Sequence, residues 1–195
     1  MNTSPSGADI AALRKSYERA ELDEIHSEPA PLQQFEHWLH EALTALERVA
    51  GPADPRLANQ YSNLAILQAE QGRPVAAESL FRRVLAIREL AYGADHPDVS
   101  RALSNLASAL VEQGKSEEAE SLCRRALALD IRVLGPEHSQ VAFRLYNLAL
   151  VREQRGHHAE AIEHYRRASA IWEKSLGPDH PNIAAALTGL ATIYN

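Results

Sequence analysis

Nine histidines are the first side chains in this sequence that could do chemistry, because histidine is a common metal ligand. His96, His138 and His180 stand at equal, wide intervals, so each lies in a different copy of a repeated unit and the three cannot meet at one ion. Glu160 and His164 are closer, but one helix that supplies this pair leaves a four-ligand shell incomplete. We therefore expect no metal site.

The single cysteine, Cys123, cannot form a disulfide within the chain. It stands midway between Phe81 and Tyr165, at the same place in neighbouring units, which favours a small core residue. A reactive thiol is the alternative. The sequence contains no phosphate-binding glycine loop, no Gly-x-Ser-x-Gly motif and no Cys–His pair placed for catalysis. We expect a protein that is not an enzyme and has no cofactor.

Paired arginines recur at the same interval as these histidines and could form an anion-binding stripe. The pairs are Arg82–Arg83, Arg124–Arg125 and Arg166–Arg167. A glutamate precedes one arginine of each pair by four residues, the favourable order for ion pairs on an exposed helix. This alternation favours a solvated outer face over an anion site.

These residues belong to a unit of about 42 residues that is repeated along most of the chain. Gly51, Gly93, Gly135 and Gly177 mark one end of the unit. The segments YSNLAILQAEQG, LSNLASALVEQG, LYNLALVREQRG and LTGLATIYN align without a gap. A position that recurs at this spacing is called a column below. Strict repetition at such a period indicates a solenoid.

Apolar residues within each unit follow helical spacing. Leu103, Leu106, Ala107 and Leu110 lie on one helix face, and Gly114 suits the turn into a second helix. Each unit is therefore a helical hairpin with a first and a second helix. The expected helices cover 55–71, 74–91, 97–113, 116–134, 139–155, 158–176 and 181–194. In links such as GADHPD, the aspartate or histidine can cap the following helix, and proline suits its first turn.

Charge and hydropathy exclude further classes of protein. The formal net charge of −6 argues against a nucleic-acid partner, which needs concentrated lysine and arginine. No apolar run approaches the roughly 20 residues that span a bilayer, and the first residues do not resemble a signal peptide. We expect no membrane partner and a cytoplasmic location.

The N-L-A triplets, the glycine turns and the G-P-D-H-P link resemble the tetratricopeptide repeat, in the longer form of about 42 residues that is found in kinesin light chains and many bacterial scaffold proteins. The resemblance covers about residues 51–195. It implies an all-α protein, an α-solenoid in which helical hairpins form a right-handed superhelix. It also implies that first helices line a concave groove for an extended peptide or a partner helix, with second helices on the convex back.

The resemblance implies twelve groove residues in three units. They are Asn59, Ser62, Asn63 and Ile66; Arg101, Ser104, Asn105 and Ser108; and Phe143, Tyr146, Asn147 and Leu150. The asparagines Asn63, Asn105 and Asn147 share a column, and their amides can satisfy the backbone of a bound peptide. They could equally bond the adjacent helix and stabilise the stack. Phe143 and Tyr146 are the expected apolar anchor.

The N-terminal stretch IAALRKSYERAELDEIHSEPAPLQQFEHWLHEAL, residues 10–43, is similar to the N-terminal segment of pyridoxamine 5′-phosphate oxidase. The similarity implies that Arg14 and Tyr17 reach over the substrate of that flavin enzyme. No strand pattern for the enzyme's catalytic barrel follows in this chain. We therefore interpret the stretch as a fused N-terminus without its own flavin site.

The sequence predicts three segments: a partly flexible segment at 1–30, a capping helix of a degenerate repeat at 31–50, and the repeat array at 51–195. An apolar stripe that includes Trp38, Leu39 and Leu43 gives the helix at 31–50 a face to pack. At the other end, Leu187 and Tyr194 lie on an apolar face with no following helix, which could mediate self-association.

The leading hypothesis is a non-enzymatic protein–protein interaction scaffold that binds a peptide or helical segment in the groove. One alternative is a partner or remnant of the flavin oxidase that acts through its N-terminal segment. The other alternative is a self-associating structural module.

Overall fold

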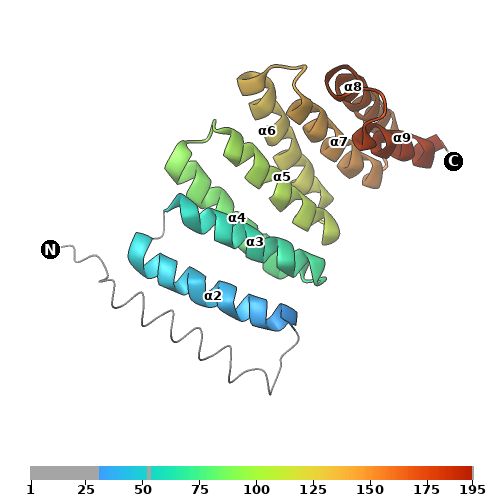
Figure 1. Ribbon diagram of the computed structural model, residues 1–195. Coiled ribbons are helices and arrows are strands. Elements are labelled where there is room, and N and C mark those ends of the chain that lie inside the picture. Colours follow the sequence, from blue (N-terminus) through green and yellow to red (C-terminus); the bar gives the residue numbers. More distant parts are fainter. Residues whose placement is uncertain (1–30, 52–53, 195) are drawn as a thin grey trace. The chain divides into compact units, whose positions relative to one another are not determined.

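The computed structural model describes residues 31–51 and 54–194, and this part of the chain contains helices and no strand (Figure 1). The helices are α2 (Pro31–Ala50), α3 (Pro55–Glu70), α4 (Pro74–Tyr92), α5 (Pro97–Glu112), α6 (Ser116–Leu134), α7 (Ser139–Gln154), α8 (His158–Leu176) and α9 (Pro181–Tyr194). The helical ranges expected from the sequence agree with these bounds to within one residue. The described residues fall into two units, with the boundary between Ala42 and Leu43.

Within the unit Leu43–Asn195, helices pack in the order of the chain. α3 and α4, α5 and α6, and α7 and α8 form antiparallel hairpins, and each hairpin packs against the next first helix (Figure 1). Every first helix from α5 onward therefore lies against the second helix before it. This arrangement confirms the predicted all-α solenoid.

The core follows the columns that the sequence displayed. Leu64, Leu106 and Leu148 are at most 2% exposed, and the alanines of the neighbouring columns are buried as deeply. Small alanine side chains let the two helices of a hairpin approach, and the leucines fill the space between hairpins. Residues far apart in the sequence thus build hydrophobic clusters that join neighbouring repeats.

Two glycine positions terminate the helices in different ways. Gly114 has a φ of 73°, its N–H donates to the Val111 carbonyl, and the Lys115 N–H donates to the Leu110 carbonyl. These bonds form a Schellman motif, which ends α5 and starts the turn into α6. Gly135, after α6, has a φ of 87° and a ψ of 156°, a region that is nearly restricted to glycine.

Side-chain caps begin the first helices, as the sequence indicated. The Nδ1 atoms of His96, His138 and His180 accept hydrogen bonds at 3.1–3.3 Å from backbone N–H groups two residues later. Asp54, in the same column, accepts from the Arg56 N–H at 2.8 Å. Each bond satisfies one of the N–H groups that a helix start leaves unpaired. The histidines in the links are therefore structural caps.

The helix at 31–50 has the predicted bounds. In its apolar stripe, Leu39 and Leu43 are buried, whereas Trp38 is 40% exposed. The assignment of this helix as the cap of a degenerate repeat, and the segment boundaries at 1–30 and 51–195, stay predictions.

Candidate functional site

First helices line the inner side of the array in the unit Leu43–Asn195. α5 contacts α7 and α7 contacts α9, whereas no contact of that extent joins α4 to α6 or α6 to α8. From α5 to α9, first helices therefore lie closer together than second helices do, which places this part of the first helices on the concave side. Side chains that point away from the second helices form the surface that we call the groove face.

The asparagine column lies on the groove face. Asn63 is exposed, and Asn105 and Asn147 are half-buried. Among the residues that the structure describes, none forms a side-chain hydrogen bond with these three amides. The donors and acceptors of these amides are therefore available to a ligand. The alternative, in which the asparagines bond an adjacent helix, has no supporting hydrogen bond within residues 31–51 and 54–194.

Several other expected groove residues use their polar atoms within the fold. Asn59 accepts a long 3.5 Å hydrogen bond from Arg88. The Ser62 hydroxyl donates to the Ala58 carbonyl of its own helix at 2.8 Å. These side chains have less capacity left for a ligand than the asparagine column.

In the second repeat, too, some expected groove residues bond within the fold and another does not. Arg101 pairs with Asp98 at 2.6 Å at the start of α5. The Ser108 hydroxyl donates to the Ser104 carbonyl at 3.2 Å. The Ser104 side chain is 4% exposed, and its hydroxyl has no hydrogen-bond partner among the described residues. Ser104 is thus a buried polar group whose hydrogen-bonding capacity is unused.

A hollow of about 170 Å³ opens on the groove face between α5 and α7, and we call it the Cys123 hollow. Its lining comprises Ser104, Ala107, Ser108, Val111, Glu112, Cys123, Asn147, Leu150 and Val151. Four of the twelve expected groove residues meet here: Ser104, Ser108, Asn147 and Leu150. The sequence analysis missed Glu112 and Cys123 as parts of the site, although the small residue in the Phe81–Cys123–Tyr165 column was visible.

A second hollow, of about 510 Å³, lies between α7 and α9. Leu150 lines both hollows and separates them, together with the body of α7. The other wall includes Thr192 and Ile193 of α9. The groove face therefore offers two neighbouring depressions on either side of one exposed leucine.

The two aromatic residues that were expected to form one anchor have different surroundings. Phe143 is 43% exposed on α7. The Tyr146 ring is half-buried, with its centroid 5.6 Å from that of Tyr165 and 5.9 Å from that of Trp172. Phe143 is the member of the pair with surface free for a partner. Ile66 of the first unit is exposed to a similar extent.

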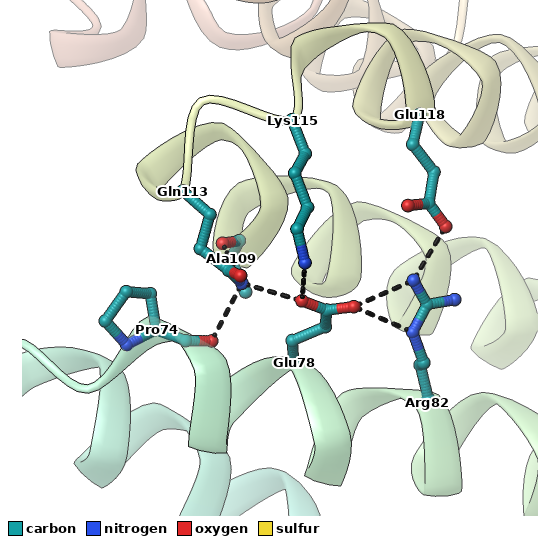
Figure 2. Close-up of polar contacts among 7 residues, drawn as sticks. All are labelled: Pro74, Glu78, Arg82, Ala109, Gln113, Lys115 and Glu118. Carbon is teal, nitrogen blue, oxygen red and sulfur yellow. Dashed lines mark hydrogen bonds and ion pairs between the residues drawn. The ribbon is translucent and has the colours of Figure 1, made fainter.

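The recurring arginines of α4 and α6 take part in ion pairs within and between repeats, whereas Arg166 of α8 donates to the Tyr194 hydroxyl at 3.1 Å. Arg82 pairs with Glu78 four residues earlier at 2.8 Å and with Glu118 of the next repeat at 2.7 Å (Figure 2). Arg83 pairs with Glu47, and Arg125 with Glu89, each across 36 residues. These contacts support the interpretation of the arginine-bearing face of the second helices as solvated and structural.

Glu78 is the centre of the network in Figure 2. Lys115 donates to its carboxylate at 2.7 Å and Gln113 at 2.8 Å, both from the turn of the next repeat, while Arg82 donates from its own helix. The hydrogen bonds from Lys115 and Arg82 lower the pKa of Glu78 to about 2. Gln113 also donates to the Pro74 carbonyl, so the turn after α5 is held against the start of α4.

The thiol of Cys123 is 3% exposed, which confirms the prediction of a core residue. Burial raises its pKa to about 12, so the thiol stays protonated and is a poor nucleophile. Within the described part of the chain, no three side chains of His, Cys, Asp or Glu come close enough to hold a metal ion. His164 lies half-buried, and burial with the nearby Arg152 lowers its pKa.

Two further expectations concern the ends of the chain. Arg14 and Tyr17, the residues implied as substrate contacts by the oxidase-like stretch, lie outside the described residues. On α9, Leu187 is 55% and Tyr194 64% exposed, while Ile183 is buried against α7 and α8. No described helix is both long and apolar enough to cross a lipid bilayer.

Stacked helical hairpins with recurring buried columns define the class of the α-solenoid built from helical repeats. A family model, the tetratricopeptide repeat, matches residues 33–90, 76–130, 98–174 and 142–195. The chain therefore belongs to the tetratricopeptide repeat family. This is a fold of protein-interaction scaffolds rather than of enzymes.

Solved structures with kinesin-light-chain-like repeats have the same fold. A candidate kinesin light chain of Podosopora anserina with nearly identical TPR-like repeats superposes with a TM-score of 0.71 at 24% identity, over 94% of this chain and 85% of its own. BtubC (BKLC) from P. vanneervenii gives a TM-score of 0.74 at 23% identity, over 96% of this chain and 72% of its own. At these identities the likeness establishes the fold.

A short stretch is similar to curated pyridoxine/pyridoxamine 5′-phosphate oxidases. The identity is 70% over 37 residues with the protein of Methylibium petroleiphilum and 58% over 45 residues with that of Acidovorax sp.. The chain spans 17% and 21% of the length of these relatives. The likeness is thus close but partial, and it shows no catalysis in this chain.

Proposed function

We propose that this protein is a non-enzymatic scaffold whose groove face binds an extended peptide or helical segment of a protein partner. The observation that carries the proposal is the column of Asn63, Asn105 and Asn147, whose amides have no hydrogen-bond partner among the described residues. Each amide offers two donors and one acceptor group, enough to pair with a peptide bond of a ligand.

The placement of the column suits an extended ligand. Asn63, Asn105 and Asn147 lie on three successive first helices, α3, α5 and α7. A peptide that runs across these helices can therefore meet one asparagine amide from each of them. Side chains between these points would face the hollows on either side of Leu150. The backbone supplies general affinity in this arrangement, and the hollows supply preference for particular side chains.

A matched pair of triple variants tests the proposal. Asn63→Ala/Asn105→Ala/Asn147→Ala removes the column from the groove face. Ser79→Ala/Ser121→Ala/Glu163→Ala changes one exposed column of the second helices, with the same spacing as the asparagines. Circular dichroism establishes that both variants fold. Partners captured from a native lysate by the wild-type chain are then identified, and their affinities for all three proteins are measured with purified components.

A lost hydrogen bond costs about 1 kcal/mol, so the groove variant should bind its partner roughly 100-fold more weakly, whereas the control variant should bind like the wild type. Unchanged affinity of the groove variant would place binding elsewhere and refute the proposal.

A second candidate function comes from the 70% identity to the oxidase segment. In this alternative the N-terminal stretch supplies Arg14 and Tyr17 to a flavin oxidase in trans. Flavin that copurifies with the full chain and a copurifying oxidase, and that is lost on Arg14→Ala/Tyr17→Ala substitution, would favour it. A purified flavin oxidase that does not bind the full chain would count against it.

A further inference from the structure

The Cys123 hollow exists because one column changes size along the array. Phe81 and Tyr165 occupy the positions that correspond to Cys123 in the preceding and following units. The Tyr165 ring reaches the next first helix so closely that a Cβ atom added to Gly189 would lie 2.5 Å from its Cζ atom. Gly189 stands in the asparagine column. A large side chain in the Cys123 column thus fills the space beside the asparagine column, and cysteine leaves that space open beside Asn147.

The surface that the wall presents to the hollow is mostly apolar, and the wall carries one unsatisfied polar group. Ala107, Val111 and Val151 line it together with Leu150. The Ser104 hydroxyl, buried on the same wall, has no hydrogen-bond partner among the described residues. A volume of about 170 Å³ is close to the roughly 150 Å³ of a cavity that binds a benzene-sized group. The space therefore suits one aliphatic side chain.

The charge beside the hollow is negative. Glu112 lines it from the last turn of α5, and Glu70 occupies the same column on α3. Both carboxylates are exposed, and neither forms an ion pair in the described part of the chain. The C-terminal ends of α3 and α5 add partial negative charge at the same edge. A cationic side chain complements this edge, and an acidic one is repelled.

We propose that the Cys123 hollow is the specificity pocket of the groove, which takes one aliphatic side chain of a peptide whose neighbouring lysine or arginine pairs with Glu112. The proposal rests on the proposed function of the groove face. The asparagine column holds the peptide backbone, and the hollow with Glu112 selects the register. Phe81 and Tyr165 occupy the corresponding positions in the neighbouring repeats, so among the described repeats a small residue in this column lies only beside the hollow between α5 and α7, which favours one register of the peptide there.

A random library of displayed twelve-residue peptides is the probe. It is selected on the full wild-type chain, and the enriched peptide is synthesised for calorimetry. We expect enriched sequences that contain an aliphatic residue next to lysine or arginine. Cys123→Phe introduces the phenylalanine that the preceding repeat carries at this position. It should weaken binding about 30-fold, which is the effect of losing the burial of one leucine-sized side chain. Cys123→Ala keeps the hollow open and should weaken binding far less than Cys123→Phe does.

Two further variants keep the test decisive if Cys123→Phe fails to fold. Ser108→Leu covers the mouth from an exposed position where the neighbouring units carry Ile66 and Leu150, and it should also weaken binding. Glu112→Gln should weaken binding of the basic peptide about threefold, with less effect at high salt.

The pocket would be overturned if the enriched peptides lack the aliphatic–basic pair, or if their binding survives both Cys123→Phe and Ser108→Leu. The groove function would still stand in either case if binding depends on the asparagine column. If the wild-type chain enriches no peptide more than the variant without the asparagine column does, both proposals are overturned.

Discussion

Replacing Glu78 by glutamine should destabilise the array at neutral pH and flatten its response to acid. Glu78 lies where Lys115 and Gln113 of the next repeat meet Arg82 of its own helix. These donors hold its pKa at about 2 against an ordinary value of 4.5. Because the pKa is lowered on folding, the ionised carboxylate stabilises the folded state at every pH above 4.5, and the stabilisation disappears as pH falls toward 2.

The size of the effect follows from the shift and from the exposure of the partners. A change from 4.5 to about 2 corresponds to roughly 3 kcal/mol at about 1.4 kcal/mol for each pKa unit. The Glu78 side chain is 12% exposed, but those of Lys115 and Arg82 are 47% exposed, so solvent screens part of this interaction. We expect Glu78→Gln to lower the free energy of unfolding by about 1–2 kcal/mol at pH 7.

Urea unfolding followed by far-ultraviolet circular dichroism at several pH values measures this difference. The gap between wild type and Glu78→Gln should close between pH 4.5 and pH 2. Glu112→Gln removes the same charge from a carboxylate without an ion pair among the described residues, and it should change stability by no more than about 0.5 kcal/mol. Equal stability of Glu78→Gln and wild type at pH 7, or a gap that persists at pH 2, would refute this account of the network.

Three further predictions concern other parts of the array. Arg144 donates to Asp130 at 2.8 Å, and both side chains are at most 6% exposed, so Asp130→Ala should cost about 3–5 kcal/mol of unfolding free energy in urea, and Asp130→Leu/Arg144→Met should recover most of it. His138→Ala should cost about 1 kcal/mol through the lost helix cap, and His138→Asp, which restores the residue type found at the first cap, should cost less; a Tm equal for both variants would contradict the capping role. Gly189→Ala should lower the Tm through a cost of about 1–3 kcal/mol, because its Cβ would meet the Tyr165 ring, and the loss should shrink in a Tyr165→Cys background.

Much of the groove face could be predicted from the sequence, because a fixed repeat period assigns every residue to a column. Asn63, Asn105 and Asn147 lie on the first helices as expected, and Ser104, Ser108, Asn147 and Leu150 meet at one hollow. The columns do not reveal which side chains already pack or form hydrogen bonds within the fold and are therefore less available to a ligand. Tyr146 was expected to join Phe143 at the surface, but its ring packs toward Tyr165 and Trp172, since those large residues lie on the next helix.

The sequence by itself determined the helices, their ends and the buried columns, because these depend on local spacing and on side chains that recur in every unit. Gly114, the histidine caps and the leucine columns all have the roles that this spacing indicates. Only the tertiary structure decided what differs between units: the hollow beside Cys123 and the network at Glu78, whose partners lie 35 and 37 residues further along the chain. A repeat unit specifies how neighbours stack, but the size of a hollow or the partner of a charge depends on which unlike side chains that stacking brings together.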